Sequence, residues 1–361
     1  MRKTLSIIIA LLLATSLGMS GCGLSSTLAL KLLVVHSYHE AWAWDQDIQR
    51  GIIEGLSRGG YIQDQDYELK TFYMDTKITY TTTEQMKERA EIALDLIDEY
   101  EPDMVFTNDD DALRHVAVEY AKRNPQKHLP FVFCGVNGDP LAYSPIIVSL
   151  AAPGGPITGA LERFPFHEAL SLAKRLNPSA TRIVLLADAS PSSTFVVNSF
   201  QQEYLDVVTN SPLEVIGLFQ VQTFQEWQAK AAGYQTEADF LGIITYHQLR
   251  DENGQIVPAP EVVDWTVHHS HLPEIGFLTF HAEDGFLAAA GVSGYDTGIY
   301  VGVMGGEILG GRDPGTIPIV DPQVTDIVFN LERANMLAMT IPAAELAKAA
   351  RVFQHIGQGR Y

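Results

Sequence analysis

Short apolar runs alternate with amphipathic segments along this chain, and the alternation limits the folds that are open to it. Apolar runs in the first half predict strands at residues 31–36, 69–74, 104–106 and 130–134. Amphipathic segments between them predict helices at residues 45–58, 83–100 and 112–123. Strands that alternate with helices predict βαβ units, and therefore a parallel sheet with helices on its faces.

The pattern restarts after a Pro/Gly-rich break at residues 151–156. Further strands are predicted at residues 182–187, 213–219, 240–246 and 275–280, and further helices at residues 166–176, 193–209 and 224–232. A chain of 361 residues also exceeds one core of ordinary size. We therefore expect an α/β protein with two lobes in series.

The last part of the chain holds too few elements for a third domain. A Gly/Ala-rich passage lies at residues 285–298. After it we expect a helix at residues 300–309, short strands at residues 316–320 and 326–330, and a helix after Pro342. We expect these elements to return to the two lobes. The predicted division is residues 31–156 plus 285–315 for lobe one, and 157–284 plus 316–350 for lobe two. A chain that crosses between lobes several times forms a hinge.

The N-terminus has the pattern of a bacterial lipoprotein signal peptide. Arg2 and Lys3 precede an apolar run, and small residues lead to Cys22. We expect residues 1–22 to be the signal, Cys22 to carry the lipid (palmitate) and residues 23–30 to be a linker. The body would then be anchored on the outer face of a bacterial membrane, on its periplasmic or extracellular side. Ordinary signal cleavage with an incidental cysteine is the alternative.

Charge and cysteine content exclude several classes of function. A net charge of −20 repels phosphate backbones, so we expect no nucleic-acid partner. Cys134 is the only cysteine besides Cys22, and its apolar surroundings predict a buried side chain. We find no CxxC or HExxH pattern, and we expect neither a metal site nor a cofactor.

Candidate ligand-binding residues in lobe one follow the predicted strands, because ligands of open parallel sheets bind outside the carboxyl ends of the strands. Aromatic side chains in the first such loop are suited to stacking on a ligand, and polar side chains after later strands are suited to binding an amine or a hydroxyl. These residues are Ser37, Tyr38, Trp42, Trp44, Asn108, Asp109 and Asn137. Packing of the tryptophans on the sheet, and helix capping by Asn108 or Asp109, are the structural alternatives.

In lobe two, hydroxyl groups gather where a strand gives way to a helix. Ser190, Ser192 and Ser193 form a predicted anion site at a helix N-terminus, unless one serine only caps the helix. Tyr246 and His281 end two further predicted strands and are added to the candidate site.

Nothing in the sequence specifies an enzyme. The chain has no GxSxG, GxxxxGK[ST] or GxGxxG motif in the required context. A hydrolase on the same scaffold would need His281 within hydrogen-bond reach of Ser37 or Ser190, with an acid behind it. The histidines at positions 268, 269 and 271 are more simply a solvated cluster than a metal site.

Several stretches, in this order and spacing, resemble the uncharacterised ABC-transporter substrate-binding proteins. They are residues 31–39 with Trp44 and Asp45, residues 158–162 leading to 176–178, residues 294–298 through 310–314, and residues 330–331 through 341–342. The resemblance implies a type I periplasmic-binding-protein fold, with two Rossmann-like lobes joined by a three-strand hinge. It also implies that the protein binds its ligand without converting it into a product. A small molecule, such as an amino acid or another small organic anion, would be captured between the lobes for an ABC permease and ATPase. A ligand-sensing module coupled to a histidine kinase is the alternative.

Overall fold

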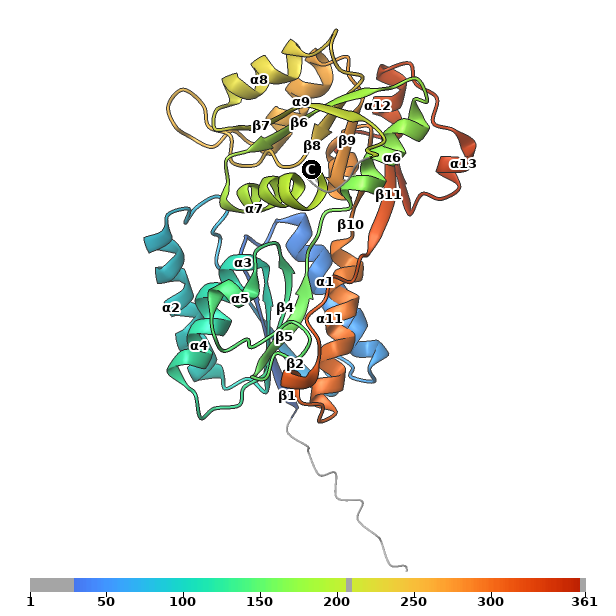
Figure 1. The fold of residues 1–361 in the computed structure, drawn as a ribbon. Helices are drawn as coiled ribbons and strands as arrows, with labels where there is room; N and C mark the ends of the chain where they lie inside the picture. The colour runs from blue at the N-terminus through green and yellow to red at the C-terminus, as the bar shows by residue number, and fades with distance from the viewer. Residues whose placement is uncertain (1–28, 206–209, 358–361) are drawn as a thin grey trace, which may run out of the picture.

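Two α/β lobes, one above the other, make up the chain (Figure 1). The structure is a computed structural model and describes residues 29–205 and 210–357. The predicted signal peptide with Cys22, and residues 23–28 of the predicted linker, lie outside the described residues. Within these residues no helix combines the length and the apolar character that a membrane span requires.

Lobe one is built on a five-stranded sheet with the strand order β2-β1-β3-β4-β5, and every neighbouring pair is parallel. Its strands are β1 (Leu30–His36), β2 (Tyr67–Tyr73), β3 (Met104–Asn108), β4 (Phe131–Val136) and β5 (Ile157–Leu161). Its helices are α1 (Ala43–Arg58), α2 (Thr83–Tyr100), α3 (Asp109–Ala112), α4 (Val118–Arg123), α5 (Pro140–Tyr143) and α11 (Gly294–Leu309). A π-helical turn at Leu113–Ala117 joins α3 to α4.

Lobe two is built on a seven-stranded sheet with the order β12-β11-β10-β9-β8-β6-β7, in which only the β10–β11 pair is antiparallel. Its strands are β6 (Arg182–Asp188), β7 (Glu214–Val221), β8 (Phe240–Ile243), β9 (Glu274–Leu278), β10 (Ala288–Val292), β11 (Thr325–Asn330) and β12 (Arg351–Phe353). Its helices are α6 (Phe166–Leu176), α7 (Pro191–Ser199), α8 (Phe224–Gly233), α9 (Ala259–His269), α10 (Phe280–Asp284), α12 (Leu331–Met336) and α13 (Ala343–Leu346). The mostly parallel sheets confirm the predicted α/β fold class.

The cores lie on both faces of each sheet. In β1, Leu33 and Val35 pack in the cluster that includes residues of α2, while Leu32 and Val34 pack in the cluster that includes residues of α1. All four side chains are fully buried. Burial of one such side chain contributes about 1.5–3 kcal/mol, so the apolar strand runs both define the elements and stabilise the lobes.

Helix α11 belongs to lobe one although it follows a strand of lobe two (Figure 1). It packs on α1 through glycines, because the two backbones touch. A Cβ added at Gly55 would lie 2.3 Å from the carbonyl oxygen of Ile299, and one at Gly302 would lie 2.4 Å from that of Ile52. Small residues at this contact therefore anchor the late helix beside the first one.

Three connections cross between the lobes and form the hinge. The first runs from β5 to α6, the second from β10 to α11, and the third from the short 3-10 turn Pro314–Thr316 to β11. Thr158 Oγ1 in β5 donates to the carbonyl oxygen of Ile317, 2.8 Å away, which ties the first connection to the third.

Several late elements differ from the prediction. Strand β10 lies in the Gly/Ala-rich passage that we expected to be irregular, and it pairs in the second sheet, whereas we had placed residues 285–315 with lobe one. Helix α11 begins at Gly294 and not at residue 300, because the Ser293 side chain caps it. The predicted strand at 316–320 is reduced to a single bridge between Ala160 and Val320. The helix after Pro342 is short, and strand β12 follows it.

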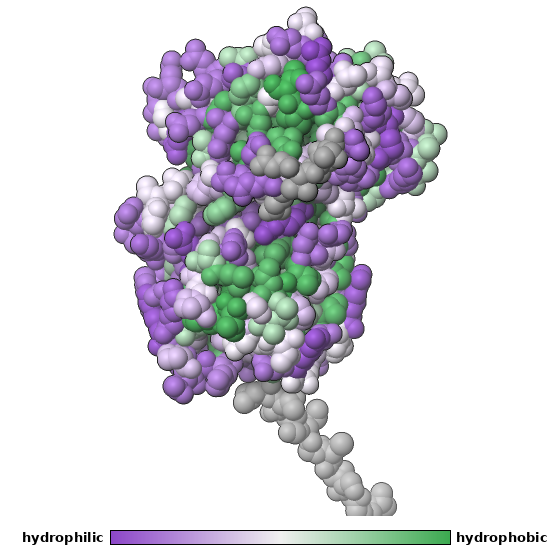
Figure 2. Space-filling model, viewed as in Figure 1, coloured by the Kyte–Doolittle hydropathy of each residue, from purple (hydrophilic) through white to green (hydrophobic). Residues whose placement is uncertain are grey.

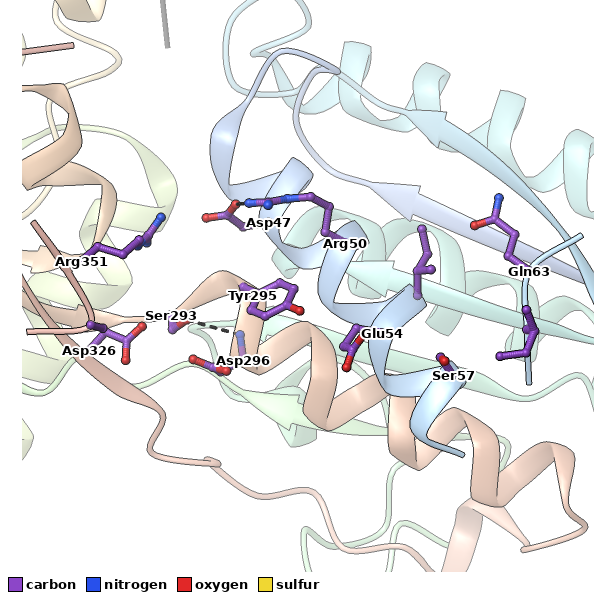
Figure 3. Close-up of a pocket in the computed structure, with 13 residues that line it drawn as sticks. Asp47, Arg50, Glu54, Ser57, Gln63, Ser293, Tyr295, Asp296, Asp326 and Arg351 are labelled. Atoms are coloured by element: carbon purple, nitrogen blue, oxygen red, sulfur yellow. Dashed lines mark hydrogen bonds and ion pairs between the residues drawn. The ribbon is translucent and has the colours of Figure 1, made fainter. Parts of the chain in front are cut away.

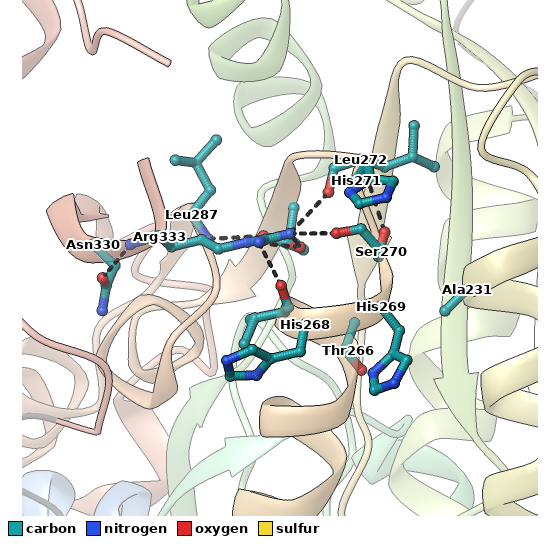
Figure 4. Close-up of polar contacts among 12 residues, drawn as sticks. Ala231, Thr266, His268, His269, Ser270, His271, Leu272, Leu287, Asn330 and Arg333 are labelled. Carbon is teal, nitrogen blue, oxygen red and sulfur yellow. Dashed lines mark hydrogen bonds and ion pairs between the residues drawn. The ribbon is translucent and has the colours of Figure 1, made fainter. Parts of the chain in front are cut away.

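A buried ion pair holds helix α12 in lobe two (Figure 4). Arg333 Nη2 lies 2.6 Å from Glu274 Oε1, and both side chains are almost inaccessible to solvent. Arg333 also donates to the carbonyl oxygens of Val267 and Ser270. The neighbouring histidines are not part of this network, since His268 Nδ1 lies 2.8 Å from the carbonyl oxygen of Asp264 and the His269 ring stacks on Trp265.

Candidate functional site

The carboxyl ends of the strands of both lobes meet at a cleft that holds two small cavities. The larger cavity is about 120 Å³ and the smaller one about 40 Å³. Side chains of both lobes line each of them, and Tyr38, Lys77 and Ser192 line both. In the space-filling view, polar side chains gather along the junction of the lobes, while apolar surface shows on the body of each (Figure 2).

Aromatic side chains form one wall of the smaller cavity. The rings of Tyr38 and Trp42 lie 5.6 Å apart in an edge-on arrangement. Trp42 also contacts the His247 ring of lobe two, at 4.4 Å between centroids. Trp44 is buried beside them, and its Nε1 has no hydrogen-bond partner among the described residues. This wall is suited to an apolar or aromatic group.

The buried carboxyl groups of Asp109 and Glu162 line the same cavity. Asp109 is 4 % exposed, and its Oδ2 has no hydrogen-bond partner among the described residues. Burial, followed by repulsion from Asp45, Glu162 and Asp110, raises the pKa of Asp109 well above its usual range. Burial likewise raises the pKa of Glu162 to about 8. Two buried carboxyl groups whose negative charges are only partly balanced by positive ones favour a cationic partner.

Asp110 and Asp111, which directly follow Asp109 in the sequence, have hydrogen-bond partners within lobe one. Asp110 accepts hydrogen bonds from the backbone amides of Asn137 and Gly138 and from the Tyr143 hydroxyl. Asp111 accepts one from Thr76 Oγ1 at 2.7 Å. Asp109 therefore supplies one oxygen without a partner among the described residues to the smaller cavity. Asp110 and Asp111 supply two hydrogen-bonded carboxyl groups to the larger one.

The predicted anion site at the start of α7 is occupied by the protein's own carboxylate. Asp188 Oδ1 accepts from the amide of Ser190 and from Ser193 Oγ, at 3.0 and 2.5 Å. Burial alone would raise the pKa of Asp188, but the Lys77 charge and these bonds hold it at about 2. Of the three serines, only Ser192 directs its hydroxyl to the opposite lobe, where it accepts a hydrogen bond from Lys77 Nζ at 2.7 Å.

The structure divides the predicted site residues into two groups. The residues that line a cavity are Tyr38, Trp42, Trp44, Asp109, Asn137, Ser190 and Ser192. The residues that line neither of these two cavities are Ser37, Asn108, Ser193, Tyr246 and His281.

Residues of the second group support the cleft from within. Ser37 Oγ bonds the Asn108 carbonyl and the Ala112 amide, and the Asn108 side chain donates to Asp45 at 2.8 Å. Tyr246 and His281 are fully buried in lobe two, where the Tyr246 hydroxyl bonds Asp284. The geometry therefore does not favour a direct contact between these five residues and a ligand.

Sequence reasoning missed Lys77, Glu162 and His247 as lining residues. Lys77 follows β2 and Glu162 follows β5, so the rule that selects strand ends applies to both. His247 stands next to the predicted Tyr246, and its ring faces Trp42 across the cleft.

A larger cavity lies elsewhere, beside the hinge (Figure 3). It measures about 640 Å³ and is lined by charged side chains of α1, including Asp47 and Arg50, together with Asp326 and Arg351 of lobe two. Arg50 and Asp47 already form an ion pair there. This cavity lacks the aromatic wall and the unsatisfied buried carboxylate of the cleft, so we assign the candidate site to the cleft.

The geometry of the cleft does not assemble the hydrolase alternative. Among the described residues, Ser37 Oγ bonds main-chain groups only, and Ser190 Oγ bonds Ser192, Ser193 and its own helix. A search of the same residues for groups of three or more metal-ligating side chains finds none.

Comparison with known proteins gives a family match over most of the chain. Residues 39–353 match the sequence model of a family described as "ABC transporter substrate binding protein". A tyrosine-binding protein of Clostridioides difficile (strain R20291) is 23% identical over 235 residues, which are 63% of this chain and 62% of that protein.

Solved structures share the fold. A structure described as an ABC domain in complex with L-Trp, from Streptococcus pneumonia, has a TM-score of 0.67 at 21% identity, covering 90% of this chain and 100% of that one. A substrate binding protein with adhesive properties from Clostridium difficile, in a ligand-free, open structure, has a TM-score of 0.65 at 18% identity, covering 91% and 100%. Both likenesses agree with the two-lobed fold described above.

Proposed function

The chain belongs to the ABC transporter substrate binding protein family, whose members are ligand-binding proteins and not enzymes. From this premise we propose that it captures an amino acid in its cleft for an ABC importer. The ligand class is an α-amino acid with an apolar, preferably aromatic, side chain. The observation that carries the proposal is the unsatisfied, buried carboxylate of Asp109 beside an aromatic wall.

The cleft offers complementary groups for such a ligand. Its ammonium group would bind Asp109 and Glu162, which are buried and lack a full set of cationic partners. Its ring would pack against Tyr38 and Trp42, in the edge-on or offset geometry that aromatic groups prefer. The names of the tyrosine-binding relative and of the L-Trp complex agree with this ligand class.

Entry of the ligand requires the lobes to separate. Ligand pockets of proteins measure about 300–1,000 Å³, whereas the two cavities of the cleft measure about 120 and 40 Å³. Trp42 and Lys77 close the gap against His247 and Ser192. A hinge rotation that opens the cleft, followed by closure on the ligand, therefore describes the binding cycle.

We place the protein on the outer face of a bacterial membrane, anchored by a lipid on Cys22, where it would deliver its ligand to a permease and ATPase. The signal pattern of residues 1–22 supports this location. Labelling of cells with a palmitate analogue should mark the wild type and the Cys134→Ala variant but not Cys22→Ala. Label on Cys22→Ala, or no label on the wild type, would contradict the anchor.

Calorimetric titration and thermal unfolding of the purified protein test the ligand class. We expect L-tyrosine, L-tryptophan or L-phenylalanine to bind, and a ligand at one hundred times its dissociation constant should stabilise the fold by about 2.7 kcal/mol. Glucose and benzoate serve as control solutes, because neither carries an ammonium group. Binding of either of these solutes with no response to any amino acid would overturn the proposed ligand class.

A further inference from the structure

Lys77 is the one lysine or arginine that lines the smaller cavity of the cleft within the described part of the chain. It lies in the loop after β2 and is 5 % exposed. Its ammonium group sits over the Tyr38 ring at 5.0 Å from the centroid and at 6.0 Å from that of Trp42. A lysine that lies over two aromatic rings and is almost inaccessible to solvent has lost most of its contact with water.

Both the side chain and the main chain of Lys77 reach the opposite lobe. Its Nζ donates to Ser192 Oγ at 2.7 Å, and its carbonyl oxygen accepts from Gln248 Nε2 at 2.6 Å. Because the two cavities share Tyr38, Lys77 and Ser192, the Lys77–Ser192 contact lies between them. Movement of the lysine away from Ser192 would join the two spaces.

Several carboxyl groups surround the single ammonium group of Lys77. Its positive charge lowers the pKa values of carboxyl groups from both lobes, among them Asp109, Glu162 and Asp188. The nearby arginines are engaged elsewhere: Arg163 donates to main-chain carbonyls of its own lobe, and Arg114 lies over the Tyr143 ring. A ligand that brought only an ammonium group would compete with Lys77 for the same carboxylates.

We propose that Lys77 determines the specificity of the cleft for ligands that carry a carboxylate. In the structure the Ser192 hydroxyl accepts the hydrogen bond of Lys77, and in the complex the ligand carboxylate takes its place. Lys77 donates in both cases, but its partner changes from a neutral hydroxyl to an ionised carboxylate. The exchange adds an attraction between opposite charges, which is strong where water is excluded, so it favours the ligand. Asp109 and Glu162 for the ammonium group, and Lys77 for the carboxylate, then match a zwitterion. This inference rests on the proposed function and adds the residue that reads the acid group.

Calorimetric titration with two matched pairs of ligands tests the inference: L-tyrosine against tyramine, and L-tryptophan against tryptamine. The amines lack only the carboxylate. We expect the wild type to bind the amino acid of at least one pair about 10- to 100-fold more tightly than its amine, the range expected for one hydrogen bond between charged groups. Lys77→Met should abolish that preference by weakening the amino acid, with the amine unchanged or tighter. Lys87→Met on the exposed face of α2 is the matched control and should leave both affinities unchanged.

The outcomes separate the inference from the function on which it rests. Equal affinity of the wild type for an amino acid and its amine would overturn the role of Lys77 while leaving amino-acid capture intact, and this measurement needs no variant. An equal loss of affinity for both ligands in Lys77→Met, with an unfolding transition like that of the wild type, would also overturn it and would make Lys77 a contact between the lobes only. No binding of any amino acid or amine by the wild type would overturn the proposed function itself.

Discussion

Asp109→Asn should weaken ligand binding and stabilise the empty protein at the same time. The substitution keeps the shape of the side chain and removes its negative charge. If Asp109 Oδ2 accepts a hydrogen bond from the ligand ammonium, loss of that charged bond costs about 1.5–3 kcal/mol, or roughly 10- to 150-fold in affinity. The backbone φ of residue 109 is 69°, in the left-handed region that asparagine tolerates well, so we expect no backbone strain from the change.

The effect of Asp109→Asn on stability has a definite sign. Burial and the neighbouring carboxylates raise the pKa of Asp109 in the folded protein, so its ionised form opposes folding. Near pH 3.8 and below, the unfolded chain also holds the proton and this cost disappears, while at higher pH the cost grows as the carboxyl group ionises. The stabilising effect of Asn over Asp should therefore be absent in acid and present at pH 8.

Calorimetric titration with L-tyrosine and urea unfolding at pH 4 and pH 8 measure the two effects. Asp95→Asn, which removes one exposed carboxylate from α2, is the matched control and should change neither. A dissociation constant for Asp109→Asn within twofold of the wild type would refute the ammonium contact. A variant less stable than the wild type at pH 8 would refute the argument that an uncompensated charge is buried there.

Three other predictions concern the pH dependence, the core and the helix contact. The pKa of Glu162 is about 8, and a ligand ammonium group favours its ionised form, so affinity for L-tyrosine should rise from pH 6 to pH 8.5. Calorimetry in buffers of different ionisation enthalpy should show that protons are released on binding. An affinity that does not change with pH would exclude this linkage. Arg333→Leu should cost about 3–5 kcal/mol in urea unfolding because Glu274 would stay buried without its partner, and Arg333→Leu with Glu274→Leu should recover much of the loss. Gly302→Ala should cost about 1–3 kcal/mol since its methyl group would meet a carbonyl of α1, whereas Gly233→Ala, which has open space, should not destabilise the fold.

The repeating elements could be predicted from the sequence because their signals are local. Helices Thr83–Tyr100 and Phe166–Leu176 begin and end where the apolar spacing indicates. Strand β10 could not be predicted in this way, since alanine and glycine carry little of the β-branched signal of a strand. Its small side chains serve close packing: a Cβ at Gly291 would lie 2.5 Å from the backbone of Leu278. That requirement comes from the assembled sheet and not from the segment itself.

The candidate site was predictable where a side chain directly follows a strand. Tyr38 and Asp109 fall at such positions and line the cleft. Tyr246 and His281 were selected by the same rule but are buried in lobe two, in part because β8 ends at Ile243, before the predicted strand end. Lys77 follows β2, whose loop carries no aromatic or acidic cluster to attract notice. Its role emerges only when the second lobe places Ser192 within hydrogen-bond distance.

Contacts between the lobes favour closure of the cleft, and the buried carboxyl groups of the cleft oppose it. Lys77 bonds Ser192 and Trp42 packs on His247, and each such contact contributes on the order of 1 kcal/mol to closure. Asp109 and Glu162 act in the other direction, because closure removes their carboxylates from water. A ligand shifts the balance between open and closed forms only by its difference in affinity for the two. An ammonium group provides that difference here, since its attraction to these carboxylates is weak in the open, hydrated cleft and strong once lobe two excludes water. The same charges that disfavour closure of the empty protein therefore make closure dependent on a ligand of the right charge.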